Sequence, residues 1–140
     1  MSWANPRFIL INKQHAFVSL CDHGFLAFAI TMFESLLEHS PDCSCYLLCM
    51  DNETYDYLRS DGLDWITAIP LDQIEYPELL EKKKDRTARE YCWTLSSHAF
   101  GAVKNISPEA ESITYVDADL YFLRSPIELF EELEESKKSI

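Results

Sequence analysis

Short apolar segments alternate with amphipathic segments along the first half of the chain, and this alternation limits the possible folds more than any other feature. Three apolar runs bounded by polar or turn residues predict buried strands, at residues 16–21, 45–50 and 65–69. Apolar residues at helical spacing predict a helix over 25–39 and a second over about 53–60, which Asp51 or Asn52 can cap. This β-α-β-α-β series predicts a parallel sheet with right-handed crossovers.

The second half of the chain is expected to continue the same architecture. Pro77 marks the first position of a helix, and a helical stripe of apolar residues runs from Ala88 to about Asn105. A fourth strand is predicted at 113–116, and Ser125-Pro126-Ile127-Glu128 resembles a capping box that begins an acidic helix over 128–135. We therefore expect residues 1–140 to form one α/β domain, a three-layer, Rossmann-like arrangement around a mainly parallel sheet.

The charge balance excludes two classes of partner. The chain has 12 Lys and Arg against 24 Asp and Glu, a net charge of −12. Nucleic acid binding requires a basic face, and an anionic membrane surface attracts basic segments, so neither is expected as a partner. No apolar run approaches the roughly 20 residues of a membrane helix, so no transmembrane segment is expected.

The cysteines and the start of the chain predict a cytoplasmic location. The five cysteines are an odd number, and no long apolar segment follows Met1–Arg7 as it would in a signal peptide. Free thiols in a reducing compartment are therefore expected. The spacing of Cys43, Cys45 and Cys49 does not match the usual zinc-binding pairs, which favours a structural role for these side chains.

The sharpest chemical feature is a pair of carboxylates, Asp117 and Asp119, directly after the predicted strand 113–116. Ligands of parallel α/β sheets bind beyond the carboxyl ends of the strands. In an extended segment, residues two apart point to the same side, so both carboxylates could hold Mg²⁺ or Mn²⁺ that bridges to a diphosphate. The alternative is that both are turn residues with solvated side chains.

Other polar residues could complete such a site. Asp22 follows the first strand and Asp51 the second, where a carboxylate could contact the base or ribose of a nucleotide. Each also has a simpler explanation, because Asp22 can begin a turn and Asp51 can cap a helix. Among the histidines, His23 stands beside Asp22 and is the candidate for a functional role. His39 suits the end of a helix and His98 a core position.

One basic cluster stands out in this acidic chain, and its members could complement phosphates if they lie near the strand ends; they are Lys82, Lys83, Lys84, Arg86 and Arg89. Arg86 and Arg89 are three residues apart, so both can lie on one face of a helix, which makes them the preferred pair. The alternative is a solvated helix face.

The stretch from Tyr115 to Pro126 resembles the nucleotide-diphospho-sugar transferases of the GT-A fold, in particular family 8 glycosyltransferases. In that family a strand is followed by Tyr-hydrophobic-Asp-Ala-Asp, a few apolar residues and a helix that begins with proline. The apolar strand at 16–21 and the strand that ends before Asp51 are similar to the nucleotide-binding half of the family, and the segment 86–91 resembles its arginine-bearing helix.

The resemblance implies a role for each matching residue. Asp119 would bind Mn²⁺ or Mg²⁺, and Asp117 would contact the metal or the ribose of a UDP- or GDP-sugar donor, with Ala118 between them in the donor-binding motif. Cys21 and Asp22 would border the base, and Asp51 would belong to the same nucleotide-binding half. Arg86 or Arg89 would approach the diphosphate or sugar. The implied enzyme is a glycosyltransferase that transfers the sugar to an acceptor.

Two departures from the family pattern limit what the resemblance implies. Tyr121-Phe122 replaces the aliphatic pair that is common after the motif, and the acceptor-binding half with its further metal ligand has no counterpart in these 140 residues. We therefore expect a partial domain, the donor-binding half, whose open sheet edge favours self-association. Two other functions stay open: a non-catalytic binding module whose acidic helix meets a basic partner, and a phosphatase-like site with Asp117 as nucleophile and Asp119 as acid.

Overall fold

The computed structural model describes residues 15–60 and 62–138 and confirms the predicted α/β class. A single all-parallel sheet has the strand order β3-β2-β1-β4. The strands are β1 (His15–Cys21), β2 (Ser44–Cys49), β3 (Ile66–Pro70) and β4 (Ser112–Tyr115). In register, Cys21 of β1 lies opposite Cys49 of β2, and Val18 lies opposite Tyr115 of β4. The carboxyl ends of the strands therefore meet at one edge of the sheet.

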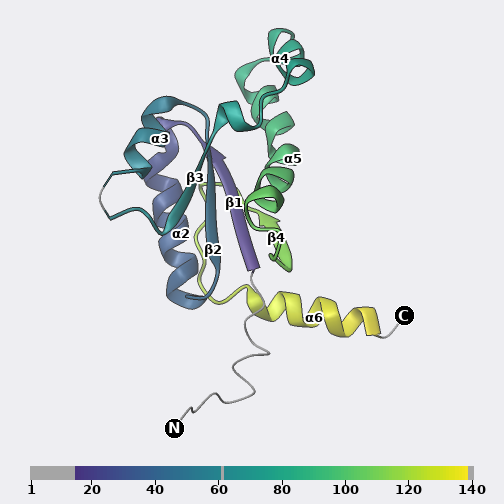
Figure 1. The fold of residues 1–140 in the computed structure, drawn as a ribbon. Helices are drawn as coiled ribbons and strands as arrows, with labels where there is room; N and C mark the ends of the chain where they lie inside the picture. Colours follow the sequence, from purple (N-terminus) through teal and green to yellow (C-terminus); the bar gives the residue numbers. More distant parts are fainter. Residues whose placement is uncertain (1–14, 61, 139–140) are drawn as a thin grey trace.

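Helices cover both faces of this sheet and give the predicted three-layer, Rossmann-like arrangement (Figure 1). On one face lie α2 (Leu26–His39), which follows the short η1 (His23–Phe25), and α3 (Asn52–Leu58). On the other face lies α5 (Ala88–Ile106), reached through η2 (Leu71–Gln73) and α4 (Pro77–Lys84). The last helix, α6 (Ile127–Lys138), lies at the amino end of β1.

Alternation along β1 divides the core into two layers. Phe17 packs on the α2 side with Phe33, whereas its neighbour Val18 packs on the α5 side with Leu95. Successive strand residues point to opposite faces, so one buried strand contributes to both layers. This is why the apolar runs that predict β1 and β2 are continuous rather than alternating.

The predicted helix starts are largely confirmed, with one addition. The Asp51 carboxylate caps α3 and accepts from the backbone N–H of Thr54 at 2.8 Å, and Pro77 occupies the first turn of α4. Helix α5 begins with a capping box that the sequence analysis did not identify, in which Thr87 and Glu90 exchange side-chain and backbone hydrogen bonds.

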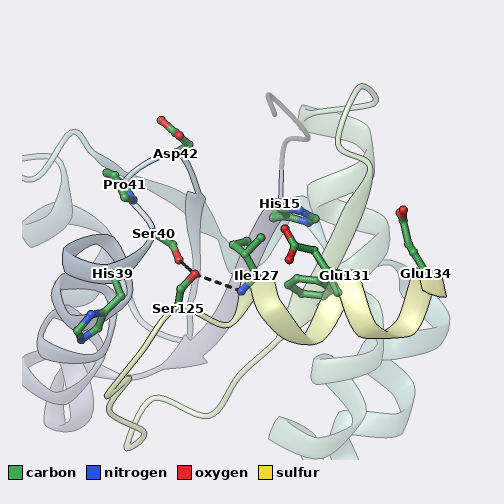
Figure 2. A pocket seen from close by; sticks show the side chains of 10 residues that line it. His15, His39, Ser40, Pro41, Asp42, Ser125, Ile127, Glu131 and Glu134 are labelled. Carbon is green, nitrogen blue, oxygen red and sulfur yellow. Dashed lines mark hydrogen bonds between the residues drawn. The ribbon is translucent and has the colours of Figure 1, made fainter. Parts of the chain in front are cut away.

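The chain after β4 returns along the α2 side of the sheet to its amino end. The backbone N–H of Phe122 donates to the Ser35 hydroxyl of α2 at 2.9 Å. At the end of this path the hydroxyls of Ser40 and Ser125 are 2.6 Å apart, and the N–H of Ile127 donates to Ser125 (Figure 2). Ser125 thus accepts from Ile127 instead of forming the predicted capping box with Glu128, whose carboxylate accepts from the Arg124 guanidinium.

Two further expectations can be compared with the structure. All five cysteines are free thiols, as predicted. Within residues 15–60 and 62–138, no helix combines the length and the apolar character needed to cross a membrane. The sheet of the described residues ends at β3 and β4. Self-association through such an edge stays a prediction, and the segment Met1–Arg7 lies outside the described residues.

Candidate functional site

The strand order reverses between β1 and β4. From β1 the chain passes through α2 to β2 on one side, whereas β4, reached last, adds to the other side of β1. In open α/β sheets, ligands bind in the crevice beyond the carboxyl ends of the two strands at such a reversal. Asp22 directly follows β1 and Asp117 follows β4 by two residues, so the structure places two of the predicted site residues in the region beyond these strand ends, which we call the crevice.

The crevice is electrostatically negative, and two half-buried side chains report its charge. Burial and the neighbouring charge of Asp117 raise the pKa of the Tyr115 hydroxyl to about 12. Burial and the charge of Asp22 raise the pKa of the Cys92 thiol of α5. Both groups therefore stay protonated near neutral pH. The aspartates at the crevice favour a cationic ligand, or an anionic ligand that binds together with a metal cation.

The carboxylate pair differs from its predicted geometry. The backbone turns at Ala118 and Asp119, where the N–H of Leu120 donates to the carbonyl of Asp117 at 3.3 Å. The expectation that both side chains project from one extended segment is therefore wrong. Asp117 interacts with the Tyr115 hydroxyl, whereas Asp119 lines a hollow of about 310 Å³ together with Phe28 of α2. Both aspartates are solvent-exposed.

Two predicted donor-binding residues are core side chains. Cys21 is 5% exposed and packs in the α2-side layer. Burial is the main cause that raises the pKa of its thiol to about 12, and the charges of Cys49, Asp22 and Asp51 raise it further. Ala118 is 9% exposed and packs in the same layer. These two residues can contact a ligand at the edge chiefly through their backbone.

Asp51 and His23 form a pair at the carboxyl ends of β2 and β1. One oxygen of the Asp51 carboxylate accepts from His23 twice, from Nδ1 at 2.7 Å and from the backbone N–H at 3.0 Å, while the other accepts from Thr54. Glu53 lies 3.5 Å from the same Nδ1. Burial alone would raise the pKa of Asp51, but the hydrogen bonds from Thr54 and His23 outweigh it and lower that pKa below its usual range.

The same contacts act on the imidazole in the opposite direction. The hydrogen bond to Asp51, and then the charge of Glu53, raise the pKa of His23 above 6.5. The Asp22 carboxylate fixes the preceding turn because it accepts from the N–H of Gly24 at 3.0 Å. The two other histidines for which a role was predicted lie elsewhere, since His39 is exposed in the last turn of α2 and His98 is half-buried against the Tyr76 ring rather than in the core.

Arg86 and Arg89, the preferred pair of the basic cluster, do not lie on one helix face. Arg86 precedes the N-cap of α5, so the expectation that it shares a helix face with Arg89 is wrong. Its guanidinium donates to the Thr94 hydroxyl, which lies about 200° around the helix from Cys92. Arg89 is three residues before Cys92 and therefore lies on the side of α5 that faces the crevice.

Two lysines of the cluster, Lys83 and Lys84, have acidic partners close by, and Lys82 is exposed in the last turn of α4. Lys83 pairs with Glu75 at 2.9 Å, and Lys84 pairs with Glu81 at 2.7 Å within α4. Surface pairs of this kind are typical of a solvated helix. Of the predicted basic residues, Arg89 is thus the one whose position suits a ligand at the crevice.

The donor set at the crevice is suited to a hard cation held by few protein ligands. In the part of the chain that the structure describes, no three or more His, Cys, Asp or Glu side chains gather as a metal site. Mg²⁺ and Mn²⁺ commonly bind one or two carboxylates and complete their coordination with phosphate oxygens and water. Asp117 and Asp119 have exposed carboxylate oxygens, so each could contribute one ligand to such an ion.

The Asp51–His23 contact was not predicted from the sequence, and it follows from the register of β1 against β2. Cys21 and Cys49 are the last residues of the two strands and lie opposite each other, so His23 and Asp51, each two residues further on, lie opposite each other as well. The proximity of Cys92 to Asp22 depends on how α5 packs, and no local pattern predicts it.

Comparisons with known proteins identify relatives without a described activity. No family model matches the chain. The chain is 34% identical over 116 residues to the uncharacterized protein YfnF of Bacillus subtilis (strain 168), which covers 83% of this chain and 38% of YfnF. It is 38% identical over 101 residues to the uncharacterized protein YfnD of the same strain, 72% of this chain and 32% of YfnD. The chain thus spans about a third of the length of the curated relatives it matches.

Proposed function

We propose that this chain binds the nucleotide-sugar donor of a glycosyltransferase, together with Mn²⁺ or Mg²⁺. The observation that supports this proposal most is the position of Asp22 and Asp117, which follow the two strands at which the strand order reverses. The donor would be a UDP- or GDP-sugar, and the reaction of the full enzyme would transfer its sugar to an acceptor.

Each residue of the crevice has a role in this proposal. Asp117 and Asp119 hold the divalent ion, which supplies positive charge to the diphosphate as it leaves the sugar. Asp22 contacts the ribose or base, and Arg89 contacts the diphosphate from α5. Burial and then the charges of Asp117 and Asp22 raise the pKa of Tyr115 and Cys92, and the negative charge of these aspartates is the reason that an anionic nucleotide would require a metal ion here.

The proposal can be tested by calorimetric titration of the chain with UDP and with GDP, each with and without Mn²⁺. We expect metal-dependent binding of one of them, and we expect Asp119→Ala to raise its Kd by at least about tenfold, because it removes a direct ligand. Glu111→Ala is the matched control, since it removes an exposed carboxylate at the amino end of β4.

The outcomes separate the proposal from its alternatives. Equal loss of binding in Asp119→Ala and Glu111→Ala would mean that net charge, not a site at the crevice, governs binding. Absence of binding to both nucleotides from folded protein would overturn the proposal. Hydrolysis of p-nitrophenyl phosphate would instead support a phosphatase-like site.

A further inference from the structure

We propose that His23 binds the nucleotide directly, as an imidazolium that Asp51 orients and that donates through Nε2 to an acceptor oxygen of the ligand. This inference rests on the proposed function and names a further residue of the same site. The acceptor oxygen belongs to either the base or a phosphate, and the experiment below distinguishes the two.

The distribution of charge at the carboxyl edge is the first support. Each of the four strands is followed within three residues by an aspartate, namely Asp22, Asp51, Asp72 and Asp117. In the same twelve positions, all of which the structure describes, His23 is the one side chain that can carry positive charge. An anionic nucleotide that reaches this edge would therefore meet a single cationic group on the strand ends.

The contacts of Asp51 are the second support. Its carboxylate accepts from the backbone of Thr54 and from both His23 donors, so its oxygens are engaged within the protein. A ligand contact and a helix cap were both expected for Asp51, and these contacts assign it to capping α3 and to positioning His23. Through the 2.7 Å hydrogen bond to Nδ1, Asp51 orients the His23 imidazole so that its other nitrogen, Nε2, can reach the ligand.

The chemistry of the ring is the third support. An ionised carboxylate can only accept, so the Nδ1 atom that faces Asp51 must carry the proton. The side chain of His23 is 61% exposed, and its Nε2 is therefore available at the edge of the sheet. The charged groups around it are Asp51 and Glu53 from α3 and Asp22 from the turn before η1, and all three favour the protonated ring, in which Nε2 is a donor.

Titration of the chain with Mn²⁺ and UDP, or GDP if that nucleotide binds, tests the inference across about pH 6 to 8.5. We expect His23→Gln to raise the Kd about tenfold near pH 6, because a hydrogen bond from a charged donor is lost, and to have a smaller effect near pH 8.5. His39→Gln is the matched control, since His39 is exposed on α2 away from the crevice.

Two further arms locate the acceptor and test the role of Asp51. Repeating the titration with the nucleoside alone distinguishes the sources: an equal effect of His23→Gln on nucleoside and diphosphate indicates the base, and an effect on the diphosphate alone indicates a phosphate. Asp51→Asn keeps a helix cap but removes the charge beside Nδ1, so we expect it to shift the pH dependence of binding to lower pH.

The results distinguish this inference from the proposed function. Metal-dependent binding whose affinity and pH profile are the same in wild type and His23→Gln would overturn the inference and leave the proposed function standing. Absence of binding by the wild type at every pH would overturn both.

Discussion

The carboxyl end of the sheet and its amino end are held together by different interactions. At the carboxyl end, Asp51 and His23 connect two loops by hydrogen bonds between exposed groups. At the amino end, Phe130 of α6 stacks on His15 with ring centroids 4.6 Å apart and contacts the edge of Phe17 at 6.2 Å. A hollow of about 360 Å³ between α6 and the turn after α2 lies beside this stack (Figure 2).

This difference indicates how the chain divides stability and binding between the two ends. Stacked and edge-on aromatic contacts at the amino end stabilise the fold through burial, which depends little on pH or salt. At the carboxyl end the hydrogen bonds between the loops leave charged groups exposed, which costs the fold little and keeps those groups available for a ligand. Substitutions at the two ends should therefore differ in how much they lower the free energy of unfolding and in how this loss depends on pH. Three predictions test that difference.

The largest effect is expected from Phe17→Ala. Phe17 is 1% exposed and contacts both Phe122 and Phe130, so its removal leaves a cavity that its neighbours cannot fill. We expect the free energy of unfolding to fall by about 3–5 kcal/mol, measured by urea denaturation. Phe100→Ala, at a position that is 41% exposed, is the control and should cost far less. Similar losses in the two variants would contradict the idea that burial concentrates in this layer.

An intermediate effect is expected from Asp51→Ala at the carboxyl end. This substitution removes the cap of α3 and the contact to His23, and we expect a loss of about 0.5–2 kcal/mol in the free energy of unfolding. Asp51→Asn should restore most of this stability because asparagine caps helices almost as well. If Asp51→Ala were as damaging as Phe17→Ala, the two ends would not differ in the way described above.

Much of the fold could be predicted from the sequence because its signals are local and periodic. The apolar runs of β1 and β2, the helical stripe of α5 and the proline of α4 each determine their own element. The parallel order of the sheet follows from the alternation of these elements. The residues of the capping box at Thr87 also fit the usual pattern, so the start of α5 has a local signal that was not used in the predictions above.

The candidate site could be predicted in its position but not in its geometry. Strand ends fix where Asp22, Asp51 and Asp117 lie, since the backbone register decides it. Side-chain directions depend on single turns and packing contacts: the turn at Ala118 separates Asp117 from Asp119, and the start of α5 one residue after its cap leaves Arg86 outside the helix. The start of α5 follows from the local capping box at Thr87, whereas the apolar run before Asp117 gave no signal of the turn at Ala118.

The smallest expected effect, and the sharpest for the comparison, is a pH-dependent contribution of the His23–Asp51 pair to stability. The pKa of His23 is raised above 6.5, so its stabilisation is fully present below about pH 6.5 and is lost as the pH rises through its folded value. The pKa of Asp51 is lowered from 3.8, so its stabilisation is present above that value and is lost as the pH falls further. The pair therefore contributes most between these limits.

Urea unfolding of wild type and His23→Gln at about pH 5.5 and about pH 9 measures this contribution. We expect His23→Gln to be less stable than wild type at the lower pH and to differ from it less at the higher pH, because the charged imidazole gains more from Asp51 and Glu53 than the neutral ring does. His39→Gln, at an exposed position of α2, should show no such change between the two conditions. A difference between wild type and His23→Gln that is independent of pH would mean that the ring holds the two loops by packing. The carboxyl end would then resemble the amino end in the kind of interaction that stabilises it.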